Sequence, residues 1–153
     1  MTMTTTIEPV TLSLELNCSA AHAFEVYTRD IASWWPTESH SVALENVRDV
    51  VFEAKVDGRI FETANDGAEH LWGTVLECEP PTHLRYQWHP GRDPQEVYTE
   101  VEVTIVDLGE TSRFELVHTG FEKYGESAAA IRNDYVSGWQ LVAGTRFKTA
   151  AEA

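Results

Sequence analysis

The spacing of the apolar residues changes once along the chain, near Gly120, and this change constrains the fold more than any motif. From Val47 to His118, apolar and polar residues alternate in short runs, which is the pattern of half-buried β-strands. After Gly120, apolar residues such as Ile131 and Tyr135 recur at helical spacing. Short strands followed by one long helix predict an α+β domain whose sheet is an antiparallel meander.

Turn signals and caps divide the two regions into elements. Val10 begins a separate alternating strand, Ser19 offers an N-cap to a short helix, and Pro36 ends a second short helix. Asp57-Gly58 is typical of a two-residue hairpin turn. We predict a helix-grip fold, in which a curved antiparallel sheet wraps the long C-terminal helix around an internal cavity. The expected strands are residues 10–16, 47–56, 59–64, 71–79, 83–89, 97–106 and 113–118, and the expected helices are 20–27, 31–35 and 128–150.

The length of 153 residues is that of one domain, which we expect to span residues 9–150 after a disordered polar tail at residues 1–8. With 25 acidic and 11 basic residues, the formal net charge of −14 repels nucleic acids and anionic membranes, so neither is an expected partner. No apolar run approaches the roughly 20 residues of a membrane span, and no signal peptide is evident, so we expect a cytoplasmic protein. The two cysteines and six histidines form no zinc motif, and we expect neither a metal nor a cofactor.

A set of short motifs in a fixed order gives the chain a resemblance to a known group. The motifs are Phe52-Glu53, residues 57–62 (DGRIFE), Trp72-Gly73, Glu79-Pro80-Pro81, Trp88, residues 116–121 (LVHTGF) and Gly138-Trp139. Between about Val10 and Phe147 the chain resembles the single-domain proteins of the START/Bet v 1-like superfamily, in the branch related to the activator of the Hsp90 ATPase. Asp57 stands where that family usually has a glycine, and the resemblance covers only the C-terminal part of the activator itself.

The resemblance implies the predicted fold but does not choose a function, because this fold serves lipid carriers, cyclases and co-chaperones. Our first hypothesis is a non-enzymatic domain that binds a small, largely apolar molecule between sheet and helix. The second is a co-chaperone-like protein that binds a partner, and the third is an enzyme of cyclase or hydrolase type. An interaction with Hsp90 is left open but not favoured, because few aromatic residues remain for an exposed interface. A homodimer is also left open.

Two glutamates on the predicted hairpin are candidates for polar chemistry. A two-residue turn at Asp57-Gly58 places Glu53 directly opposite Glu62. Because opposed like charges destabilise a sheet, one interpretation is that both side chains point to water. The other is that both face the cavity and share a proton or a cation that grips a polar ligand group. The strand pattern leaves both interpretations open.

His118 is the second candidate for polar chemistry. It shares a strand face with Phe114 and Leu116, so its side chain should point inward. One interpretation is a core histidine that is paired with a backbone group. The other is a hydrogen-bonding or acid–base group in the cavity, which would serve an enzyme together with Glu53 or Glu62.

Aromatic residues are numerous at positions that should face inward. Five tryptophans in one domain favour core packing, but aromatics with a few polar groups are also the usual composition of a small-molecule site. Trp34 and Trp35 fall in the helix pair expected at the cavity entrance. The predicted cavity is lined by Trp34, Trp35, Trp72, Tyr86, Trp88, Val103, Leu116, His118, Tyr135 and Trp139.

Overall fold

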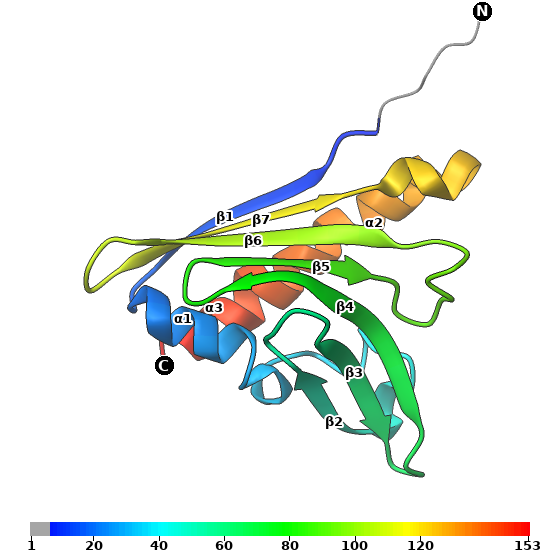
Figure 1. Ribbon diagram of the computed structural model, residues 1–153, viewed down its shortest axis with the longest axis horizontal. Coiled ribbons are helices and arrows are strands. Elements are labelled where there is room, and N and C mark those ends of the chain that lie inside the picture. The colour runs from blue at the N-terminus through cyan, green and yellow to red at the C-terminus, as the bar shows by residue number, and fades with distance from the viewer. Residues whose placement is uncertain (1–6) are drawn as a thin grey trace, which may run out of the picture.

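The computed structural model describes residues 7–153 and confirms the predicted helix-grip fold. Residues 1–6 of the predicted tail lie outside the described range. Seven antiparallel strands form one curved sheet in the order β1-β7-β6-β5-β4-β3-β2, so the strands after the first follow one another as a meander (Figure 1). The strands are β1 (Val10–Leu16), β2 (Val47–Phe52), β3 (Arg59–Ala64), β4 (Glu69–Glu79), β5 (His83–Trp88), β6 (Thr99–Asp107) and β7 (Ser112–Thr119).

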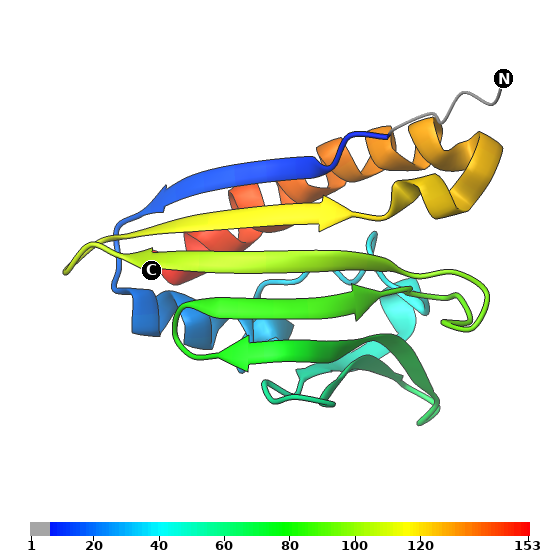
Figure 2. The ribbon, with the colours of Figure 1, turned by 45° about the horizontal axis from the view of Figure 1, so that its top comes forward.

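A continuous C-terminal helical rod crosses one face of this sheet (Figure 2). It consists of α2 (Ala128–Leu141), a π-helical segment η4 (Val142–Phe147) and α3 (Lys148–Ala151), close to the predicted range. Trp139 and Phe147 are eight residues apart, and in a regular α-helix their side chains would point about 80° away from each other. The π-helical turn of η4 is wider than an α-helical turn and reduces this angle. Both side chains are therefore buried against side chains of β7. The sequence pattern did not predict the π-helical turn.

Short helices occupy the connections. The N-cap predicted at Ser19 is confirmed, because its hydroxyl accepts a hydrogen bond from His22 N (3.2 Å) at the start of α1 (Ala20–Tyr27). The predicted second helix is one 3-10 turn, η1 (Ile31–Ser33). Two more 3-10 segments, η2 (Leu44–Asn46) and η3 (Phe121–Ser127), precede β2 and α2. No helix within residues 7–153 is long and apolar enough to cross a membrane.

Aromatic rings fill the interior between α1, the sheet and the helical rod. The ring of Tyr27 in α1 lies 5.3 Å from that of Phe114 in β7 and 5.2 Å from that of Phe147. Its hydroxyl oxygen lies 2.7 Å from that of Tyr86 on β5, and both tyrosines are buried. This half of the interior is therefore a packed core.

The register of the β2–β3 hairpin differs from its prediction. Val50 lies opposite Glu62, because β2 ends at Phe52 and a loop over residues 53–58 follows. The predicted pairing of Glu53 with Glu62 is therefore wrong, as is the two-residue turn on which it rested.

Strand β4 is the reason for the longer loop. Asp57 N donates to the Val75 carbonyl (2.9 Å), and Val75 N donates to the Gly58 carbonyl (2.8 Å). Gly58 is also pressed onto the loop, since a Cβ there would lie 2.1 Å from the Glu53 carbonyl oxygen. The Asp57-Gly58 pair thus bonds to β4 instead of closing a tight turn between β2 and β3, and the local sequence signal cannot reveal this competition.

Candidate functional site

A pocket of about 370 Å³ lies between α2 and the segment that joins η1 to β2. Its volume falls within the range of small-molecule sites in proteins. Exposed residues of the joining segment and of the loop after β5 contribute to its lining, so the pocket reaches the surface. The lining residues are Trp35, Ser39, His40, Ser41, Val42, Trp88, Pro90, Gly91, Tyr135, Gly138, Trp139 and Val142.

Three tryptophans from different elements form the apolar side of the pocket. Trp88 ends β5, Trp139 lies on α2, and Trp35 follows η1. The ring centroids of Trp35 and Trp88 are 5.7 Å apart, those of Trp88 and Trp139 are 6.2 Å apart, and those of Trp35 and Trp139 are 6.3 Å apart. Clustered indole rings offer broad apolar surfaces to a flat molecule.

A buried carboxylate holds the opposite side, which is formed by residues 39–42. Glu62 is fully buried on β3. Its Oε1 accepts hydrogen bonds from Val42 N (2.6 Å) and Trp72 Nε1 (2.7 Å), and its Oε2 accepts one from Ala43 N (2.8 Å). Hydrogen bonds to a charged acceptor are stronger than neutral ones. Glu62 therefore fixes the pocket wall without being part of the pocket surface.

Two further contacts tie the same segment to its surroundings. The indole N–H of Trp35 donates to the His40 carbonyl (2.7 Å). The guanidinium of Arg146 on η4 lies 3.1 Å from Glu38 Oε1 and joins the segment to the helical rod. The wall is thus fastened to the core, to β3 and to the C-terminal helix, which favours a preformed site.

Polar atoms reach the pocket from Ser39, His40 and Tyr135. Ser39 Oγ lies 2.7 Å from His40 Nδ1. Tyr135 Oη accepts a hydrogen bond from Trp88 Nε1 (3.2 Å). Burial raises the pKa of Tyr135 to about 12, so the phenol stays protonated and keeps its own O–H as a donor. Among residues 7–153, no group of three or more His, Cys, Asp or Glu side chains is placed to hold a metal ion.

His118 points inward, as its strand parity predicts, but it lies beneath the pocket. Its Nδ1 accepts a hydrogen bond from Trp139 Nε1 (3.0 Å), so Nε2 carries the proton and donates to Thr99 Oγ1 (2.7 Å). Thr99 in turn donates to the Trp88 carbonyl (3.2 Å). Both ring nitrogens are occupied, and the chain of hydrogen bonds orients the indole of Trp139 and ties it to the backbone of Trp88.

The burial of His118 makes folding stability sensitive to acid. Desolvation lowers its pKa to about 3, against 6.5 for a free histidine. The unfolded chain therefore takes up a proton that the folded protein does not, and stability falls as the pH drops from 6.5 toward 3. Between pH 7 and pH 5.5, we expect wild type to lose about 1 kcal/mol more unfolding free energy than the His118→Gln variant in urea titrations. Equal losses of unfolding free energy in wild type and the variant would contradict the conclusion that buried His118 stays neutral.

The structure brings only part of the predicted site together. Trp35, Trp88, Tyr135 and Trp139 line the pocket. The other inward-facing residues lie in the packed core instead. They are Trp72, Tyr86, Val103, Leu116 and His118, each at most 1% exposed. Alternation along a strand predicts which face of the sheet a side chain lies on, but it does not predict whether that side chain is covered by other residues.

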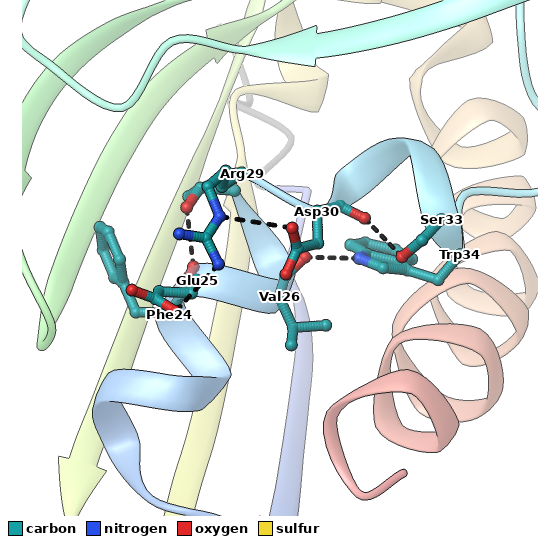
Figure 3. Close-up of polar contacts among 8 residues, drawn as sticks. Phe24, Glu25, Val26, Arg29, Asp30, Ser33 and Trp34 are labelled. Atoms are coloured by element: carbon teal, nitrogen blue, oxygen red, sulfur yellow. Dashed lines mark hydrogen bonds and ion pairs between the residues drawn. The ribbon is translucent and has the colours of Figure 1, made fainter.

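Trp34 faces the other side of its segment, beside α1 (Figure 3). Its Nε1 donates to the Val26 carbonyl (2.7 Å), and its ring lies 5.3 Å from that of Phe147. It therefore packs α1 against the helical rod and does not line the pocket.

The three acid–base candidates do not form one cluster. Glu62 is bonded to backbone and indole N–H groups, and His118 is sealed beneath Trp139. Glu53 lies on the β2–β3 loop, where its Oε1 accepts a hydrogen bond from Arg59 N (2.8 Å). The structure therefore does not bring His118 together with Glu53 or Glu62 in a cavity, as an acid–base site would require.

Sequence reasoning missed the polar side of the pocket. Ser39, His40, Ser41 and Val42 belong to an irregular segment with no apolar period, and Gly138 has no side chain to attract notice. The only available signal was a serine–histidine–serine run placed shortly after Trp34-Trp35-Pro36.

Comparisons with known proteins show what the chain is similar to. Residues 17–152 match the family described as activator of Hsp90 ATPase homolog 1-like protein. Comparison with the curated proteins finds no match.

Several solved structures have the same fold. One is Txn09, an anthrahydroquino-gamma-pyrone synthase, with 30% identity over 94% of this chain and 97% of that one and a TM-score of 0.65. Another is CalC from Micromonospora echinospora, a self-sacrificing resistance protein, with 25% identity over 94% of both chains and a TM-score of 0.69. A third is DynU16, a putative protein in the dynemicin biosynthetic locus, which is 16% identical over 97% of this chain and 48% of that one, with a TM-score of 0.67. At that identity, the likeness to DynU16 shows the fold alone.

Proposed function

The chain belongs to the activator of Hsp90 ATPase homolog 1-like family of the START/Bet v 1-like superfamily, and on that premise we propose that it binds a small, flat, largely apolar molecule. The observation that carries this proposal is the pocket of about 370 Å³ walled by Trp35, Trp88, Tyr135 and Trp139. Aromatic walls with a few polar groups at the edge are typical of small-molecule sites. The net charge of −14 favours a neutral ligand over an anionic one.

One of the named relatives supports a ligand of this kind. Txn09, 30% identical, is named as the synthase of an anthrahydroquino-gamma-pyrone, which is a flat aromatic compound. An enzymatic step on such a compound is the second candidate function for this chain. It would depend on residues of the pocket, because His118 has both ring nitrogens occupied and Glu62 is bonded to the wall segment.

A co-chaperone role has less support. Partner surfaces usually present exposed aromatic or arginine anchors. Trp34, Trp35 and Phe121, which lie in the connecting segments beside the sheet, are only 4%, 8% and 0% exposed and cannot serve as such anchors. An acidic chain with buried aromatics is a poor candidate for a large interface, so we keep ligand binding as the first proposal.

The Gly138→Leu variant is expected to lose ligand binding while keeping its fold. Gly138 lines the pocket, and a Cβ there would lie 3.9 Å from His40 Nε2, so a larger side chain would project into the space. Leucine is a better helix former than glycine, which protects stability. We expect N-phenyl-1-naphthylamine, a neutral probe whose emission rises in apolar sites, to bind wild type and to bind the variant roughly tenfold or more weakly.

Ser137→Leu is the matched control, because Ser137 is the exposed neighbour of Gly138 on α2 and does not line the pocket. This variant should bind the probe as wild type does. Absence of saturable binding to wild type would overturn the proposed function, and equal loss in both variants would remove the pocket as its site.

A further inference from the structure

We propose that His40 selects the ligand, in that its Nε2 accepts a hydrogen bond from a hydroxyl group on a flat aromatic molecule. The inference rests on the proposed function and names the chemical class of the ligand: a neutral aromatic compound that carries a phenolic or enolic hydroxyl. A ligand of the same shape without that hydroxyl would leave the imidazole nitrogen unpaired and would bind less tightly.

The position of the ring carries the first step. His40 lines the pocket and is partly buried in the wall opposite α2. Its Nε2 lies 3.9 Å from where a Cβ would stand on Gly138, an ordinary van der Waals distance, so this nitrogen lies beside α2 in the pocket lining. Within residues 7–153, the His40 ring is hydrogen-bonded through Nδ1, and Nε2 has no hydrogen-bond partner. This imidazole nitrogen is therefore free to form a hydrogen bond with a ligand in the pocket.

The neighbouring serine carries the second step, because its hydroxyl is the hydrogen-bond partner of the other ring nitrogen. Ser39 Oγ lies 2.7 Å from His40 Nδ1 and 3.4 Å from the Pro36 carbonyl oxygen. The serine has one proton to donate, and a carbonyl can only accept. In the tautomer that the inference requires, His40 Nδ1–H donates to Ser39 Oγ and the serine hydroxyl points to the Pro36 carbonyl. In that tautomer, Nε2 carries the free lone pair and accepts.

The backbone of His40 keeps this acceptor in a fixed place. His40 N donates to the Pro36 carbonyl (2.9 Å), and the His40 carbonyl accepts from Trp35 Nε1 (2.7 Å). Two residues later, Val42 N is held by Glu62 (2.6 Å). An acceptor on a segment anchored at both sides costs little ordering entropy when a ligand binds.

The surrounding chemistry favours a neutral hydroxyl as the donor. A carboxylate or phenolate has no proton to offer to Nε2, and the net charge of −14 disfavours an anion. Tyr135, across the pocket, keeps an O–H to donate, which suits a carbonyl or ether oxygen on the same ligand. One acceptor and one donor beside three indoles fit a hydroxylated aromatic molecule.

A pair of probes that differ by one methyl group tests the inference. Dissociation constants of 2-naphthol and 2-methoxynaphthalene are measured by displacement of N-phenyl-1-naphthylamine and by calorimetry, for wild type, His40→Leu, Ser39→Ala and His70→Leu. In the His40→Leu variant, the dissociation constant of 2-naphthol should rise about tenfold relative to that of 2-methoxynaphthalene. The dissociation constant of 2-methoxynaphthalene should stay within about twofold of its wild-type value. Ser39→Ala should give a smaller shift in the same direction, because the tautomer is no longer fixed. His70 is partly buried on β4 outside the pocket, and its variant should resemble wild type.

The outcomes separate this inference from the proposed function. If both probes bind and His40→Leu leaves their ratio unchanged, the role of His40 is overturned while ligand binding stands. If neither probe nor N-phenyl-1-naphthylamine binds wild type, the proposed function falls and the inference falls with it. Nitrogen-15 NMR of the imidazole in wild type is an independent measurement, in which a protonated Nδ1 supports the assignment and a protonated Nε2 in the neutral ring contradicts it.

Discussion

Replacing Glu62 with glutamine should lower the unfolding free energy by about 3 kcal/mol. The buried carboxylate accepts three hydrogen bonds, from the backbone N–H groups of Val42 and Ala43 and from the indole of Trp72. A glutamine has a single acceptor oxygen, and its NH₂ group would face an N–H donor. Each buried donor left without an acceptor costs about 1–3 kcal/mol, more beside a lost charge. In a protein of this size, the melting temperature should fall by roughly 6–12 °C.

This sign is the reverse of what a repelling glutamate pair would give, since removing one of two opposed carboxylates would raise stability. Glu53→Gln is the matched control, because Glu53 is partly exposed on the loop and should cost less than about 1 kcal/mol. The Glu62 variant should also bind N-phenyl-1-naphthylamine more weakly, because the wall that carries His40 and Val42 loses its anchor. An unchanged melting temperature in Glu62→Gln would show that the carboxylate does not hold this segment.

A methyl group on Gly73 should disrupt the centre of the sheet and cost more than about 3 kcal/mol. A Cβ at this position would lie 1.8 Å from the Gln87 carbonyl oxygen, and a backbone atom cannot rotate away as a side chain can. Trp72 is the extra residue of a bulge beside Gly73, since Ile60 pairs with Gly73 and Phe61 with Leu71. We therefore expect Gly73→Ala to unfold at a much lower urea concentration than wild type.

Gly144→Ala provides the comparison for this prediction. A Cβ on Gly144 would have only ordinary contacts, 3.5 Å from Gln140 Oε1 and 3.9 Å from the Trp139 carbonyl oxygen. This substitution in the helical rod should be neutral or stabilising by up to about 1 kcal/mol. If Gly73→Ala and Gly144→Ala unfold at the same urea concentration, the close approach of β4 and β5 at Gly73 is not as described. The hydrogen bond from Trp72 to Glu62 depends on the close packing of β4 and β5 at Gly73. Gly73→Ala should therefore also weaken probe binding, because Glu62 holds the pocket wall.

Much of the architecture followed from periodicity. Alternation along 97–106 and 113–118 identified strands β6 and β7 to within two residues at each end, together with the inward parity of His118, and helical spacing after Gly120 identified the rod that covers the sheet. These predictions succeeded because the backbone geometry of a strand or helix fixes which side chains share a face. The π-helical turn at Val142–Phe147 was not predicted, because a π-helix differs from an α-helix in its backbone hydrogen bonds and has no distinctive amino-acid composition.

The site itself was predictable only in part. Trp35, Trp88, Tyr135 and Trp139 were identified because aromatics at inward positions are candidates for any cavity. His40 was not, because it lies in an irregular segment whose path is set by hydrogen bonds to Glu62 and Trp35. The role of Glu62 was misread for a related reason, since two of its three hydrogen-bond donors are backbone N–H groups about twenty residues earlier in the chain.

The sequence by itself determined the class of fold, the order of strands and helix, and the face that each periodic residue presents. Those properties depend on the local geometry of strands and helices, which the spacing of apolar residues records. Only the tertiary structure decided that Tyr27, Phe114 and Phe147 fill one half of the interior while a pocket remains beside Trp88 and Tyr135. Which half is filled depends on how the helical rod, the curved sheet and residues 36–46 meet, and those contacts join residues too distant in sequence for any local pattern to encode.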